Sequence, residues 1–131
     1  MSELRADTIT ASDGTSPVTL TKQQASKCWA NWDMSGTPSI DESFAISTLT
    51  DGGTGEGKIT FVAAFDSTTY GVCTSTGEKS GGGNRGIGVR GSSTGIATTH
   101  TTFHMFTFPG SGGTSGADVD YNCASWHGDL A

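Results

Sequence analysis

Apolar and polar residues alternate with a period of two along most of the chain after residue 26, which indicates β-strands with one buried face. The clearest segment is 28–32, where Cys28, Ala30 and Trp32 fall on one face and Trp29 falls on the other. At least one of the two tryptophans must therefore enter a core. The alternation predicts a strand over 28–32.

Further strands follow at regular intervals, each bounded by Gly, Asp, Asn, Ser or Pro. One strand is predicted over 39–49, and a glycine-rich loop at 51–57 joins it to a strand over 58–62 as a hairpin. Four more are predicted over 69–74, 85–90, 98–108 and 119–126. No segment keeps a helical period for more than a turn or two. Roughly seven or eight strands predict an all-β domain over 27–131, an antiparallel β-sandwich with jelly-roll-like character.

The first 26 residues form a separate unit, because their alternation is weak and a turn at 12–15 interrupts it. Their larger apolar residues are too few to hold a core of their own. We expect this N-terminal arm to dock on the domain or on another chain through Leu4, Ile9, Val18 and Leu20.

Composition limits the classes of function. The 131 residues suit one domain, and the hydrophobic fraction of 33% becomes ordinary once the 20 glycines are added. The net charge of −6, with Lys and Arg scattered along the chain, argues against nucleic-acid binding. No apolar run is long enough to insert into a membrane.

Three cysteines cannot form a complete disulfide framework, so reduced, packed thiols are expected, with one bridge left open if the mature protein meets oxygen. The start of the chain lacks the basic and apolar regions of a signal peptide. Synthesis in a cytoplasm is therefore expected.

The opening of the chain and three ordered blocks carry a resemblance to a known family. Residues 1–10, with the sequence MSELRADTIT, are similar to the start of many tail-fibre and fibre-like appendage proteins of tailed bacteriophages. Segments 27–32, 39–55 and 58–61 are similar to a domain that those proteins often carry at their distal end. Long fibres place a shaft between the two parts, whereas here only residues 21–26 connect them. The resemblance therefore favours a short appendage, a fibre tip or a head-surface decoration protein.

The resemblance implies a virion structural protein, assembled in the cytoplasm of a host bacterium and contributing to host attachment. It implies a homotrimer whose arm, residues 1–26, docks on other virion proteins. Two alternatives stay open, a head decoration (cement) protein and a carbohydrate-binding adhesin module that contacts a host surface glycan.

Candidate chemical groups do not assemble into a catalytic, cofactor or metal site. His100 and His104 share a face of a predicted strand about 13 Å apart, too far for one ion, although a histidine cluster around a trimer axis stays open. His127 has no serine nucleophile in a suitable turn. The loop 51–56 has two carboxylates but lacks the spacing of a calcium loop. We therefore expect a non-enzymatic protein without a cofactor.

Aromatic residues are the remaining candidates for function. We expect six of them in the core or in a subunit interface: Trp29, Trp32, Phe44, Phe61, Phe103 and Phe106. Trp126 and its neighbour His127 lie near the end of the sequence and are the candidates for a surface ligand contact, such as a stacked sugar.

Overall fold

The computed structural model describes residues 26–77, 84–90, 95–108 and 115–129, which form strands and no helix. The strands are β1 (Cys28–Asp33), β2 (Ser39–Phe44), β3 (Ile46–Gly53), β4 (Glu56–Phe61), β5 (Gly71–Gly77), β6 (Arg85–Val89), β7 (Ile96–Ala97), β8 (His100–Thr107), β9 (Ser115–Gly116) and β10 (Tyr121–His127). The N-terminal arm, with Leu4, Ile9, Val18 and Leu20, lies outside the described residues except for Ser26. The all-β prediction is confirmed.

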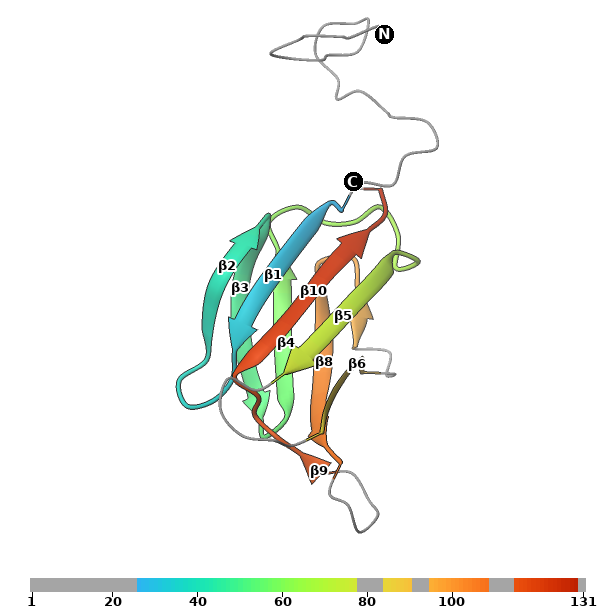
Figure 1. Ribbon diagram of the computed structural model, residues 1–131. Helices are drawn as coiled ribbons and strands as arrows, with labels where there is room; N and C mark the ends of the chain where they lie inside the picture. Colours follow the sequence, from blue (N-terminus) through green and yellow to red (C-terminus); the bar gives the residue numbers. More distant parts are fainter. Residues whose placement is uncertain (1–25, 78–83, 91–94, 109–114, 130–131) are drawn as a thin grey trace, which may run out of the picture.

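Two antiparallel sheets pack face to face as a β-sandwich (Figure 1). One sheet has the order β2-β1-β10-β5 and the other has the order β3-β4-β8-β6, with the short strands β7 and β9 also paired to β8. A jelly-roll connectivity in particular stays a prediction. No helix in the described ranges could cross a membrane.

The chain changes sheets at Ala45, and there the prediction of one strand over 39–49 is wrong. Strand β2 pairs with β1, whereas β3 pairs with β4 in the opposite sheet. Between them Ala45 has a φ of 57°, a left-handed conformation that is uncommon outside glycine. The Ala45 carbonyl accepts a hydrogen bond of 3.0 Å from the Val62 N–H, which fixes this corner.

The hairpin of β3 and β4 is confirmed, but its loop is much shorter than predicted. Asp51 pairs with Gly57 and Gly53 pairs with Glu56, so only Thr54 and Gly55 make the turn. Gly52 lies at a bulge between the paired residues Asp51 and Gly53, and both glycines continue the strand although their composition is typical of a loop. Gly55 has a φ of 74°, which suits glycine at the tip.

Aromatic rings from both sheets fill the core. The ring of Phe103 in β8 lies 5.3 Å from that of Trp32 in β1 and 5.8 Å from that of Trp126 in β10. Phe61 contacts Trp126 edge-on at 5.3 Å and Phe65 at 5.0 Å. Each such buried ring stabilises the fold by about 1.5–3 kcal/mol relative to an exposed position.

Most buried polar groups in this core are hydrogen-bonded. The Asn122 amide nitrogen donates to the Val119 carbonyl at 2.8 Å and to the Trp32 carbonyl at 3.3 Å, while its oxygen accepts from the Thr76 hydroxyl at 2.9 Å. The Trp126 indole N–H donates to the Thr101 hydroxyl at 3.0 Å. The indole nitrogen of Trp32, by contrast, is buried without a hydrogen-bonding partner among the described residues.

Candidate functional site

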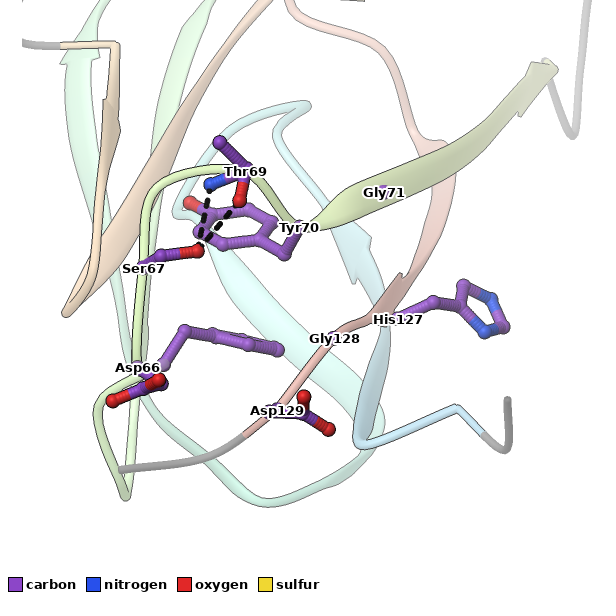
Figure 2. Close-up of a pocket in the computed structure, with 9 residues that line it drawn as sticks. Asp66, Ser67, Thr69, Tyr70, Gly71, His127, Gly128 and Asp129 are labelled. Atoms are coloured by element: carbon purple, nitrogen blue, oxygen red, sulfur yellow. Dashed lines mark hydrogen bonds between the residues drawn. The ribbon is translucent and has the colours of Figure 1, made fainter. Parts of the chain in front are cut away.

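A polar depression of about 260 Å³ opens at one end of the sandwich, between the segment that follows β4 and the end of β10. Figure 2 shows the residues that line it. They are Phe65, Asp66, Ser67, Thr69, Tyr70, Gly71, His127, Gly128 and Asp129. Its polar side chains come from two segments that are far apart in the sequence.

Backbone contacts bring these two segments together. The Asp66 N–H donates to the Asp129 carbonyl at 2.8 Å, so the two aspartates lie side by side at the rim. Gly128 packs directly on the floor, because a Cβ there would lie 2.8 Å from the Cβ of Tyr70 and 3.2 Å from Cδ1 of Phe65. A side chain at Gly128 would therefore displace the floor of the depression.

Tyr70 belongs to the floor and not to the reactive groups. Its hydroxyl lies 2.7 Å from the Thr101 hydroxyl and donates toward the carbonyls of Ala97 and His100, each at 3.0 Å. Burial raises the pKa of this phenol above its ordinary value. Tyr70 therefore stays protonated near neutral pH and ties the loop to the sheet β3-β4-β8-β6.

The depression offers hydrogen-bonding groups but no catalytic set. The Ser67 and Thr69 hydroxyls lie 2.6 Å apart and bond to each other. The imidazole of His127 points away from Asp66 and Asp129 (Figure 2). Within the described ranges, no three His, Cys, Asp or Glu side chains gather as a metal site would require.

A second candidate surface is the outer face of the sheet β2-β1-β10-β5. The strand register places Phe44, Trp29 and Ser125 in one row across β2, β1 and β10. The next row consists of Glu42, Asn31 and Cys123. These six residues are called the Trp29 face below.

His127 extends the Trp29 face toward the depression. It follows Ser125 by two residues on β10 and therefore lies on the same side of the strand. Nε2 of His127 lies 3.1 Å from the Ser125 hydroxyl, a hydrogen bond between neighbouring outward side chains. The Trp29 face and the depression are thus neighbouring parts of one surface.

The structure corrects the prediction for Trp126. This residue has no exposed surface, and its ring packs between Phe61 and Phe103, so it cannot contact a surface ligand. Its place near the end of the sequence suggested exposure. The strand pairing instead carries it into the core, because Trp126 in β10 lies opposite Cys28 in β1.

The other predicted residues divide between the core and the surface. Trp32, Phe61 and Phe103 are buried in the core. Trp29 and Phe106 are half-buried on outer faces, and Phe44 is 58% exposed, so these three lie outside the core. A subunit interface at any of them stays a prediction.

His100 and His104 lie on one face of β8, as their spacing predicted, with His104 exposed and His100 half-buried. His100 lies opposite Thr60, and His104 lies opposite Glu56 on the outer face of β4 and β8. Glu56 in turn forms an ion pair with Arg90.

The depression was not predicted from the sequence. Asp66 and Asp129 have no motif, and only the fold brings them together. Segments 65–66 and 126–129 each contain an aromatic residue near an aspartate, and this pattern is too common in sequences to predict a binding site.

Comparisons with known proteins give no relative. No protein-family model matches the chain, and neither the curated proteins nor the solved structures contain a match.

Proposed function

We propose that this chain is a structural subunit of the virion of a tailed bacteriophage, a short tail-fibre-like appendage or another particle-surface subunit that contributes to host attachment. One observation carries the proposal. The resembling segments 27–32, 39–55 and 58–61 form the four consecutive strands β1 to β4. They supply two neighbouring strands to each sheet, so the resemblance covers a continuous part of the sandwich and not separate loops.

The edges of the sandwich support display at high local concentration. Strand β2 is an edge of its sheet and carries Asp41 and Glu42, and the edge strand β5 is composed largely of Ser, Thr and Gly. Charged and weakly apolar edge strands resist edge-to-edge aggregation. Such edges suit many copies that stand close together on a particle.

Incorporation into particles tests the proposal. We expect mass spectrometry of purified virions from a phage that encodes the chain to detect the full-length protein. Deletion of residues 1–20 should abolish incorporation while far-ultraviolet circular dichroism still reports a folded β domain. Tyr121→Ala, at an exposed position of the sandwich, is the matched control and should be incorporated normally. Absence of the full-length protein from particles would overturn the proposal.

Two further measurements test the oligomeric state of the subunit and its position on the particle. Light scattering should give three times the chain mass of 13.4 kDa, and a monomeric mass would contradict the homotrimer. Cryo-electron microscopy of particles should place the subunit on the tail. Density on the capsid surface would instead favour the decoration-protein alternative.

A further inference from the structure

The Trp29 face combines aromatic rings with hydrogen-bonding groups on the outer side of one sheet. Phe44 and Trp29 lie opposite each other on β2 and β1, and Ser125 continues their row on β10. Asn31 and Glu42 form the next row. We propose that this face binds a neutral saccharide. The biological setting of this inference, recognition of a cell surface by a particle, rests on the proposed function, whereas the binding itself does not.

The two rings provide the stacking part of the site. Phe44 is 58% exposed, and Trp29 is half-buried, so its ring is held by the sheet while part of it faces solvent. The C–H faces of a sugar ring pack on such aromatic surfaces. Strand pairing fixes the backbone of both residues, so the conformational entropy lost when a ligand arrives is that of the side chains.

The neighbouring polar groups match sugar hydroxyls. Residues two apart on a strand are about 6.7 Å apart, so the Asn31 and Glu42 row lies within reach of a ligand stacked on the rings. The Asn31 amide both donates and accepts hydrogen bonds, and the Glu42 carboxylate accepts them. The Ser125 hydroxyl, paired with His127, provides a further group on the other side of Trp29.

Charge and solvation select a neutral sugar among the alternatives. The six residues of the face include one carboxylate and no Lys or Arg. Lys27, two residues before Trp29, is a single neighbouring cation, and the net charge of −6 disfavours a strongly anionic glycan. A second copy seated on this face in a symmetric dimer would bury Glu42 from both chains, which is costly without a paired cation. A neutral polyhydroxyl ligand instead satisfies Glu42 and Asn31 by hydrogen bonds.

The inner tryptophans make the test specific. The chain has three tryptophans, and Trp32 and Trp126 have no exposed surface. Quenching of tryptophan fluorescence by acrylamide therefore reports mainly on Trp29.

The full chain is applied to an array of neutral oligosaccharides with sialylated and sulphated counterparts. We expect binding to at least one neutral oligosaccharide and none to the anionic ones, and protection of Trp29 from acrylamide by the sugar that binds.

Variants identify the face that binds. Trp29→Ala should weaken binding by about tenfold or more, and Trp29→Phe should restore much of it because a ring remains. Phe44→Ala, at a more exposed position, keeps the test valid if Trp29→Ala does not fold. Tyr121→Ala is the matched control, since Tyr121 is 43% exposed on the same side of β10 but four residues from Ser125.

Several outcomes would overturn the inference. These are a folded protein that binds no neutral sugar on the array, binding that survives both Trp29→Ala and Phe44→Ala, and bound sugar that leaves Trp29 open to acrylamide. An oligomer that dissociates in Phe44→Ala would also overturn it by identifying the face as a subunit interface. Virion incorporation is measured separately, on the wild type and on Phe44→Ala. A wild-type protein that is incorporated normally but binds no sugar would reject the site and leave the virion assignment intact.

Discussion

The two faces of the sheet β2-β1-β10-β5 carry similar aromatic residues in different surroundings. On the inner face, Trp32 and Trp126 have no exposed surface and both contact Phe103. On the outer face, Trp29 is half-buried and Phe44 is largely exposed, among polar neighbours. The side of the pleat that a ring takes decides its role. Inner rings hold the two sheets together, and outer rings are available for recognition.

The largest expected effect is a difference in stability between two single variants, one that removes an inner ring and one that removes an outer ring. Trp126→Ala should lower the free energy of unfolding by about 3–5 kcal/mol, because it leaves a cavity between the sheets. Trp29→Ala should lower it by only about 1 kcal/mol, since part of its surface already faces water. Urea unfolding of both variants measures the difference. Equal losses would remove the distinction between the faces.

Two glycines that line the depression, Gly128 and Gly71, differ in the space around them and should differ in their tolerance of a side chain. Gly128→Ala should destabilise the protein by about 1–3 kcal/mol, because its Cβ would press on Tyr70 and Phe65. Gly71→Ala, the matched control in the same depression, should change stability by less than about 0.5 kcal/mol, since its Cβ meets nothing closer than 3.8 Å. Thermal unfolding midpoints of the two variants check this. A tolerated Gly128→Ala would mean that the floor packs less closely than described.

The two inner tryptophans differ in their hydrogen bonding. Trp126→Phe removes the indole donor to Thr101, whereas Trp32→Phe removes an indole nitrogen that has no partner in the described part of the chain. Both lose similar ring area, so Trp126→Phe should cost about 1 kcal/mol more. Chemical denaturation of the pair measures this. A larger loss in Trp32→Phe would point to an unseen partner for its nitrogen.

The smallest effect is a dependence of stability on alkaline pH. Burial raises the pKa of the Cys28 thiol from 9.0 to about 12. The folded state therefore holds this proton more tightly than the unfolded state does. The protonated Cys28 thiol contributes fully to the free energy of unfolding below pH 9, and this contribution is lost progressively as the pH rises toward 12. The loss is about 0.8 kcal/mol at pH 9.5.

Cys28→Ala is the control for that pH dependence. The difference in unfolding free energy between wild type and Cys28→Ala should shrink between pH 8 and pH 9.5, a range below the ordinary pKa of Tyr70. A difference that stays constant would mean that the thiol ionises in the folded state as readily as in the unfolded chain.

The alternation along the chain predicted most of the longer strands but not their partners. It assigned Cys28, Ala30 and Trp32 correctly to an inner face, because burial follows the pleat. It could not place the break at Ala45, since the residues on both sides alternate in the same way. Only the pairing of β2 with β1 and of β3 with β4 separates them.

The candidate surfaces depend still more on pairing between distant segments. Trp126 was expected at the surface because it lies near the end of the sequence. Asn122 and Ala124, which share its face, are weak signals of a buried strand and did not argue against that prediction. The outward position of Trp29 followed from the alternation, but its neighbours Phe44 and Ser125 come from two other strands. The sequence alone therefore identified the rings and not the face that they form.

The most direct test of the division between inner and outer rings is acrylamide quenching of tryptophan fluorescence in the folded wild type and in Trp29→Phe. Trp29 should account for nearly all of the accessible emission, so quenching in Trp29→Phe should fall to the level expected of buried indoles. Quenching that is unchanged by Trp29→Phe would show that Trp32 or Trp126 meets solvent, and would contradict the account.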